Sequence, residues 1–335
     1  MTVLSIGHIE IYTGDRASLV DYFVSALDLT DVAWVRTDDA QSSLLEGGDV
    51  RLLVTEGPIA AEYLDRHGDG VADIAFICDD VPATRERALR AGARPAGATA
   101  VSAFGSVRHS LLPATTRYAP AGLPWVPSGE TRAAGPRPGH IRSLDHIAVV
   151  LDPGDLAGRV EFYLEAFGFE RYSSEFIEVG NQAMDSIVAR NPAATATFTF
   201  LEPVTSRAAG QLDAFLARNE GPGVQHLAFL VDEIVPAVRD FRDRGVEFLH
   251  TPGAYYDALA ERLREMSVEI GDLRDTSVLA DRDEWGYLLQ LFTRSPYPRN
   301  TLFYELIQRR GARGFGSANI RALYEAVERD RIVAE

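Results

Sequence analysis

Two histidines and one glutamate in the second half of the chain have the residue types and the spacing of a metal site. His146 and His226 are 80 residues apart, and Glu305 follows after another 79 residues. Two imidazoles and one carboxylate that leave other coordination positions open suit an Fe(II) ion that activates O₂. A single histidine would more often be an ordinary core or surface residue, so the prediction rests on the three together. We expect His146, His226 and Glu305 to bind the metal and to act in catalysis through it.

Glu305 lies in the middle of a predicted strand, Thr301–Gln308. Side chains on a strand alternate between its two faces, so Phe303, Glu305 and Ile307 share one face. A carboxylate on an inward face is costly unless it is paired. The alternative is an edge strand that leaves Glu305 in water, and the two upstream histidines favour the paired arrangement.

These residues belong to the second of two weakly similar copies of one module. Each copy begins with a short alternating segment, typical of a strand, followed by a helical pattern and further strands. The sequence GVADIAF at 70–76 resembles GVQHLAF at 223–229. In the first copy, His8 and Asp73 take the places of His146 and His226. We therefore expect the first copy to have lost the metal site and to serve as structure.

The repeat predicts an α+β protein made of two tandem modules, each a curved sheet with helices outside. A segment rich in Gly, Pro and Ala separates the copies. We expect a structural domain at 1–117, a linker at 118–142 and a catalytic domain at 143–335, which ends in a helix over 317–334. The other histidines (His67, His109, His140 and His250) fall in predicted loops or near the linker and are given no role.

Composition excludes several classes of function. The formal net charge of −16 argues against nucleic acids and anionic membranes, which need basic surfaces. The single cysteine, Cys78, excludes an internal disulfide and fits a reducing cytoplasm. The N-terminus shows no signal peptide, and no stretch is apolar enough to cross a membrane. A homodimer is an option that the sequence leaves open.

Four segments of the second half carry a specific resemblance. They are GPGVQH at 221–226, GYLLQLFT at 286–293, LFYELIQR at 302–309 and GFGSAN at 314–319. They resemble the α-keto-acid-dependent dioxygenases that act on 4-hydroxyphenylpyruvate, within the vicinal-oxygen-chelate superfamily of paired βαβββ modules. The resemblance implies Fe(II) as cofactor, and 4-hydroxyphenylpyruvate and O₂ as substrates.

That family has two branches on the same scaffold, one that forms homogentisate and one of secondary metabolism, as in antibiotic biosynthesis, that forms 4-hydroxymandelate. Homogentisate-forming members usually carry Pro-x-Asn where this chain has Thr199 and Leu201, and Phe where it has Ile320. These departures resemble the mandelate-forming branch, so we expect benzylic hydroxylation. Ala318 departs from the common pattern of both branches.

Further pocket residues follow from the motif match. Strand alternation places Gln290, Phe292 and Phe303 toward the cavity, and the resemblance adds Ser186, Gln211, Gln225 and Asn319 as substrate-binding residues. Gln225 adjoins His226, so it faces the cavity only if the strand carries a bulge. Phe315 should pack over the substrate ring, beneath a C-terminal helix that excludes water.

Two other classes remain as alternatives. A metal-free small-molecule-binding protein of the same superfamily would not need the three ligand candidates together. An extradiol ring-cleaving dioxygenase shares such a triad, but the Gly-Phe-Gly-x-x-Asn segment at 314–319 does not suggest one.

Overall fold

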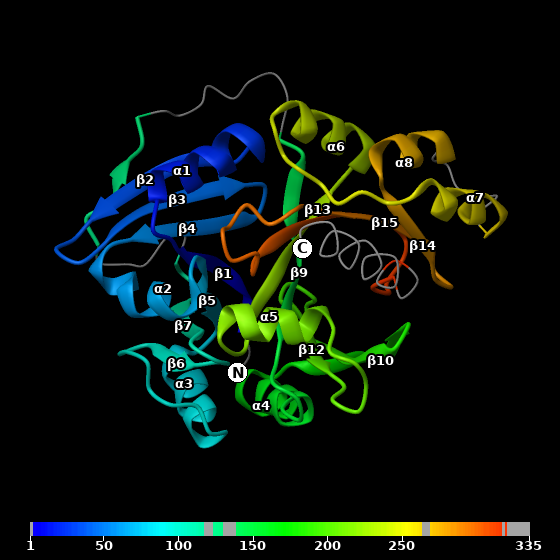
Figure 1. The fold of residues 1–335 in the computed structure, drawn as a ribbon. Coiled ribbons are helices and arrows are strands. Elements are labelled where there is room, and N and C mark those ends of the chain that lie inside the picture. The colour runs from blue at the N-terminus through cyan, green and yellow to red at the C-terminus, as the bar shows by residue number, and fades with distance from the viewer. Residues whose placement is uncertain (1–2, 117–122, 130–138, 263–268, 317–318, 320–335) are drawn as a thin grey trace.

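The computed structural model describes residues 3–116, 123–129, 139–262, 269–316 and 319. Within these residues the chain forms two eight-stranded sheets, and the helices lie outside them (Figure 1). The first sheet has the strand order β6-β7-β5-β1-β4-β3-β2-β8, and the second has the order β10-β11-β12-β9-β13-β16-β15-β14. Both sheets are mostly antiparallel. The prediction of two curved α+β halves is confirmed.

The first sheet is built from strands that pair across long connections, with β1 at its centre. Its strands are β1 (Val3–Tyr12), β2 (Thr30–Arg36), β3 (Gln41–Gly47), β4 (Val50–Glu56), β5 (Gly70–Cys78), β6 (Ala100–Ser102), β7 (Arg108–Pro113) and β8 (Val126–Pro127). The helical segments of this half are α1 (Arg16–Asp21), the π-helical turn η1 (Tyr22–Ala26), the 3₁₀ turn η2 (Pro58–Ala60), α2 (Ala61–His67) and α3 (Val81–Arg90).

The second sheet repeats this arrangement around β9 and β13. Its strands are β9 (Ile141–Val150), β10 (Glu170–Val179), β11 (Gln182–Arg190), β12 (Thr197–Pro203), β13 (Gly223–Val231), β14 (Leu279–Arg282), β15 (Tyr287–Phe292) and β16 (Phe303–Arg310). Its helices are α4 (Leu156–Phe167), α5 (Gln211–Asn219), α6 (Ile234–Asp243), α7 (Gly253–Arg262) and α8 (Ile270–Thr276). The predicted C-terminal helix over 317–334 lies outside the described residues, apart from Asn319.

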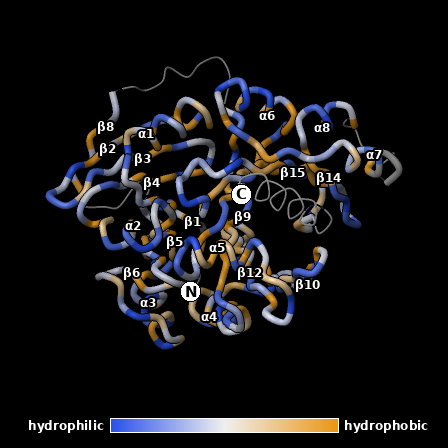
Figure 2. The backbone as a smooth tube through the Cα atoms, viewed as in Figure 1, coloured by the Kyte–Doolittle hydropathy of each residue, from blue (hydrophilic) through white to orange (hydrophobic). Residues whose placement is uncertain are grey.

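One hydrophobic core joins the two halves. It includes Phe23 and Phe76 of the first half with Phe167, Phe198 and Tyr304 of the second, all fully buried. Figure 2 shows hydrophobic residues concentrated along the strands and hydrophilic residues at the outer turns. Burial of each such side chain stabilises the fold by about 1.5–3 kcal/mol, so this shared core holds the two sheets together.

Two features of the first half differ from the expectations. The segment expected to be a linker contributes β8, which pairs with β2 through Trp34 and Val126. His109 lies in β7 rather than in a loop. It is fully buried, with Nδ1 2.8 Å from the carbonyl of Ile74 and Nε2 2.7 Å from the hydroxyl of Tyr163 in α4. His67 is likewise in α2, between the carbonyl of Asn219 and the hydroxyl of Ser106. Both buried histidines thus connect the first half to helices of the second half, α4 and α5. The sequence around a single histidine does not reveal such a contact.

Candidate metal centre and cavity

The three predicted ligands lie on three neighbouring strands of the second sheet. β9 and β13 are antiparallel, and β13 and β16 are parallel. His146 and Glu305 are both cross-strand partners of Ala228, which lies between them, and His226 is two residues from Ala228 on β13. Because partners across a sheet share a face, all three side chains point to the same side.

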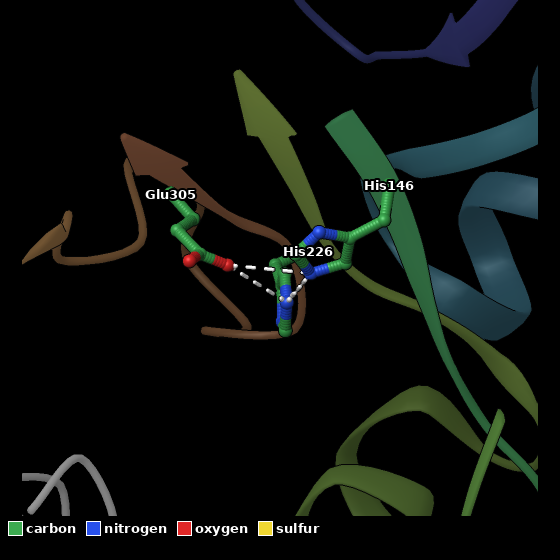
Figure 3. Close-up of side chains that lie close together, drawn as sticks. All are labelled: His146, His226 and Glu305. Carbon is green, nitrogen blue, oxygen red and sulfur yellow. Dashed lines mark hydrogen bonds and ion pairs between the residues drawn. The ribbon is translucent and has the colours of Figure 1, made fainter. Parts of the chain in front are cut away.

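Figure 3 shows the three side chains converging from their separate strands. The Nε2 atoms of His146 and His226 are 3.4 Å apart, and each is 3.4 Å from Oε2 of Glu305. All three residues are buried. The centre of a triangle with these 3.4 Å sides is about 2.0 Å from each corner, which is close to the bonds of about 2.0–2.2 Å that N and O ligands make to transition metals.

The hydrogen bonds behind the ligands fix which nitrogen of each histidine is available. Nδ1 of His146 is 2.9 Å from Oδ1 of Asp145, and Nδ1 of His226 is 3.3 Å from Oε1 of Gln225. Both acceptors call for a proton on Nδ1, which leaves the lone pair of each Nε2 directed toward the Glu305 carboxylate. Three electron-pair donors that face one another are stabilised by a cation, so the residues fit a divalent metal.

Burial and neighbouring groups shift the pKa values of His226 and of Asp145. Burial lowers the pKa of His226, which favours the neutral imidazole that binds metal. Burial would raise the pKa of Asp145, but hydrogen bonds from Arg309 and His146 outweigh it and hold the pKa of this carboxyl well below its usual range. Asp145 therefore stays ionised and orients His146.

The three ligand candidates line a cavity inside the second sheet. The cavity has a volume of about 50 Å³, and its lining consists of the three ligand candidates with Met184, Thr199, Leu201, Gln211, Leu212, Gln225, Gln290, Phe292 and Phe315. Cavities for drug-sized ligands are typically about 300–1,000 Å³. A substrate with an aromatic ring therefore requires some of this lining to move.

Strand register explains why the predicted pocket residues share this cavity. Thr199 and Leu201 of β12 pair with Ala148 and Val150 of β9. Ala148 and Val150 are two and four residues after His146, so they lie on the same face of β9 as His146. Phe292 of β15 pairs with Glu305. The hydroxyl of Thr199 is buried and has no hydrogen-bond partner within the described part of the chain. This hydroxyl is therefore available to a ligand in the cavity.

Gln225 reaches the cavity because β13 carries an irregularity next to it. The pairing with β9 shifts between Val224 and His226, so Gln225 is the extra residue of a bulge. A bulge re-aims a side chain that would otherwise point to the opposite face. Gln225 lines the cavity and contacts His226, as the sequence required of a pocket residue at this position.

Three predicted pocket residues, Phe303, Ser186 and Asn319, are not part of the cavity lining. Phe303 stacks on the ring of His226, with 5.0 Å between ring centroids, but is not part of the cavity lining. Ser186 lies on the cavity-facing side of β11, where its hydroxyl donates to the carbonyl of Glu175 at 3.3 Å. Asn319 is fully buried and donates to Oε1 of Gln290 at 2.8 Å. Ile320 and Ala318 lie outside the described residues.

Gln290 connects the carboxylate of the cluster to the C-terminal segment. Its amide donates to Oε1 of Glu305 at 2.8 Å, and its carbonyl oxygen accepts from Asn319, which in turn accepts from the hydroxyl of Tyr255 at 3.1 Å. Sequence reasoning missed Tyr255, Arg309, Asp145, Met184 and Leu212. Only two of these carried a usable signal: Asp145 directly precedes His146, and Met184 shares a strand face with Ser186.

Comparison with known proteins agrees with this architecture. The model of the Glyoxalase/Bleomycin resistance protein/Dioxygenase superfamily matches residues 143–291. The structure of a mutant of 4-hydroxymandelate synthase from Streptomyces coelicolor is 50% identical, with a TM-score of 0.89, over 98% of this chain and 99% of that chain.

Curated relatives extend the similarity. The 4-hydroxyphenylpyruvate dioxygenase of Yarrowia lipolytica is 30% identical over 97% of this chain and 91% of its own length. The enzyme of the same name from Pyricularia oryzae is 31% identical over 95% of this chain and 82% of its own length. The chain therefore belongs to the 4-hydroxyphenylpyruvate dioxygenase-like family, which includes 4-hydroxymandelate synthase, within the vicinal-oxygen-chelate superfamily.

Proposed function

We propose that this protein is a non-haem Fe(II) dioxygenase that converts 4-hydroxyphenylpyruvate and O₂ to 4-hydroxymandelate and CO₂. The observation that carries the metal-dependent part is the triangle of His146, His226 and Glu305, whose three donor atoms face one another at 3.4 Å. His146, His226 and Glu305 would hold Fe(II), which would supply the activation of O₂ and a binding site for the α-keto acid. The overall reaction is balanced, because 4-hydroxyphenylpyruvate and O₂ together contain the same atoms as 4-hydroxymandelate and CO₂.

The residues of the chain bind the substrate and exclude water. The unpartnered hydroxyl of Thr199 is a hydrogen-bond donor and acceptor for a polar group of the substrate. Gln211 and Gln225 supply further amide groups at the same cavity, whereas Leu201, Phe292 and Phe315 supply apolar contacts for the ring. Phe315 packs edge-on against His146, with 5.1 Å between ring centroids, and shields the metal side of the cavity from water.

The choice of product is favoured by the wall formed by β12. Thr199 is polar where the homogentisate-forming pattern has Pro, Leu201 is apolar where it has Asn, and both line the cavity with the ligand candidates. Small changes in ring placement decide which carbon lies in reach of oxidation. The 50% identity to the mutant of 4-hydroxymandelate synthase from Streptomyces coelicolor, against 30% and 31% to the 4-hydroxyphenylpyruvate dioxygenases of Yarrowia lipolytica and Pyricularia oryzae, supports the same choice.

The second candidate is formation of homogentisate, and the curated relatives named 4-hydroxyphenylpyruvate dioxygenase are the observation that favours it. The metal centre is identical in this alternative and the product differs. A metal-free binding protein is disfavoured because it gives no reason for two imidazole lone pairs and a carboxylate to converge.

The dependence of the reaction on the metal centre is tested by measuring O₂ uptake and CO₂ release with 4-hydroxyphenylpyruvate, Fe(II) and ascorbate. We expect equal amounts of both in the parent protein and at least a thousandfold loss in His226→Ala. His250→Ala is the matched control, because His250 is an exposed histidine outside the cavity. Full activity in His226→Ala would contradict the proposal.

A further inference from the structure

Arg309, at the end of β16, binds the carboxylate that orients a metal-ligand histidine. Its Nε and Nη2 donate to Oδ2 and Oδ1 of Asp145 at 2.7 and 2.8 Å. The side chains of Arg309 and Asp145 are only 20% and 10% exposed. Such a two-pronged contact fixes the plane of the carboxylate as well as its position. Because Asp145 also accepts from Nδ1 of His146, Arg309 sets the orientation of the imidazole through it.

The same guanidinium holds the segment that covers the cavity. Its Nη1 donates to the carbonyl of Gly314 at 2.6 Å and to that of Ala312 at 3.4 Å. The guanidinium carbon is 5.2 Å from the ring centroid of Phe315, within the range of a cation–π contact. Phe315 in turn packs against His146. Arg309 therefore contacts both Asp145, which orients His146, and Phe315, which lines the cavity.

We propose that Arg309 is a positioning residue that couples metal binding at His146 to the placement of residues 312–315 over the cavity. The inference rests on the proposed metal-dependent function and adds a link between its two parts. A metal bound by His146 fixes the imidazole, Asp145 and the guanidinium, and so favours the closed position of Phe315. By thermodynamic reciprocity, the closed segment raises the affinity for the metal by the same factor.

This coupling matters because the cavity is too small for an aromatic substrate unless its lining moves. Phe315 belongs to no strand or helix. Its ring contacts Arg309, His146 and Tyr172, and its carbonyl accepts from Nε2 of Gln290 at 3.4 Å. Movement of Phe315 without loss of the metal requires the contacts between Arg309 and the segment to break while those to Asp145 persist. The guanidinium of Arg309 allows the two sets of contacts to separate, because Nη1 donates to the segment whereas Nε and Nη2 donate to Asp145.

The neighbouring residue Arg310 provides a matched control. It has the same charge on the same strand, but its guanidinium pairs with Glu233, and both side chains are largely exposed. Within the described residues, its side chain makes no hydrogen bond or ion pair with Asp145 or with the cavity lining. Arg310→Gln removes one positive charge from β16 without touching either end of the proposed link.

The experiment combines metal titration with hydrogen exchange on the metal-free full-length protein. Co(II) is titrated into the parent, Arg309→Gln, Arg310→Gln and Asp145→Asn proteins. Exchange of the peptide spanning 310–316 is then followed by mass spectrometry with and without saturating Co(II). The amides of Arg313 and Gly314 donate to Asp283, so their exchange reports opening of this segment. Circular dichroism checks that each variant is folded.

We expect Co(II) to slow exchange of this peptide in the parent and in Arg310→Gln. Arg309→Gln is expected to bind Co(II) about 10–100-fold more weakly and, at saturation, to show no slowing by Co(II). Asp145→Asn keeps the shape of the side chain, and it should weaken Co(II) binding and reduce the slowing as well.

Two results would overturn the inference while leaving the proposed function intact. One is an Arg309→Gln protein whose Co(II) affinity equals that of the parent. The other is undiminished slowing of exchange by Co(II) in that variant, which would make Arg309 a support for the ligand alone. A parent protein that binds no Co(II) at His146 and His226 would contradict the metal centre itself, and with it both proposals.

Discussion

Arg108 donates from Nε to Oδ2 of Asp73 at 2.7 Å, on adjacent strands of the first sheet. The register pair at this place in the second sheet is Phe303 and His226. Nη2 of Arg108 also donates to Glu10 at 3.0 Å, so one guanidinium pairs with two carboxylates that are nearly or fully buried. The first sheet thus holds an internal cation where the second sheet has its candidate metal ligands, in accord with a structural role for the first copy.

Removal of that cation should destabilise the whole protein. Arg108→Met leaves Glu10 and Asp73 buried without a positive partner, which costs about 3–5 kcal/mol in the free energy of unfolding. Urea unfolding at pH 7.5 measures the change. Arg51→Met, which removes only a partly exposed pair with Glu46, is the control and should cost less than about 1 kcal/mol. Equal effects of the two substitutions would contradict the role of Arg108 as the positive partner of Glu10 and Asp73.

His109 should make stability depend on pH between about 4 and 6.5. Burial lowers its folded-state pKa from the ordinary 6.5 to about 4. In this window the unfolded chain binds a proton that the folded chain does not, so the free energy of unfolding falls as the pH falls. The loss attributable to His109 approaches about 3 kcal/mol below pH 4.

The contribution of His109 is isolated by comparison with His109→Gln. The variant lacks the titrating group, so its free energy of unfolding, measured in urea at a series of pH values, should change less over this window than that of the parent. Carboxylates titrate in both proteins and cancel in the difference. Identical pH dependence in parent and variant would refute the assignment.

Gly316→Ala should disturb the contact between Gln290 and Asn319. A Cβ at Gly316 would lie 2.5 Å from Oε1 of Gln290, and the residue has a φ of +73°. Gly180 has a similar φ of +58° with no atom within 4 Å of an added Cβ, so Gly180→Ala carries the backbone strain alone. We expect a larger loss of stability in Gly316→Ala than in Gly180→Ala, and a lower kcat/KM only in Gly316→Ala. Equal kcat/KM values in the two would contradict the role of this contact.

Thr199→Val should weaken substrate binding without loss of metal. The substitution keeps the shape of the side chain and removes the hydroxyl that has no partner in the described structure. A lost hydrogen bond of about 0.5–1.5 kcal/mol corresponds to a reduction of roughly 2–12-fold in kcat/KM. Steady-state kinetics with 4-hydroxyphenylpyruvate measures it, with Co(II) affinity as the check on the metal site. An unchanged kcat/KM would show that the substrate does not contact this hydroxyl.

The sequence predicted that His146, His226 and Glu305 lie close together, as the structure shows, but not the network around them. Strand alternation gave Glu305 its face, and the internal repeat and the resemblance to a known family grouped it with the two histidines. Asp145 and Arg309 are 164 residues apart, and the side chains in that pair are specified only when β9 and β16 lie on either side of β13. The bulge at Gln225 and the inter-sheet contact of His109 depend on packing in the same way.

The product formed from 4-hydroxyphenylpyruvate distinguishes the proposed function from its alternative most directly. Purified protein is incubated with Fe(II), ascorbate, O₂ and 4-hydroxyphenylpyruvate, and the product is separated by chromatography and identified by mass spectrometry against authentic standards. We expect 4-hydroxymandelate as the main product. Homogentisate as the main product would contradict the role given to Thr199 and Leu201 while leaving the metal centre in place.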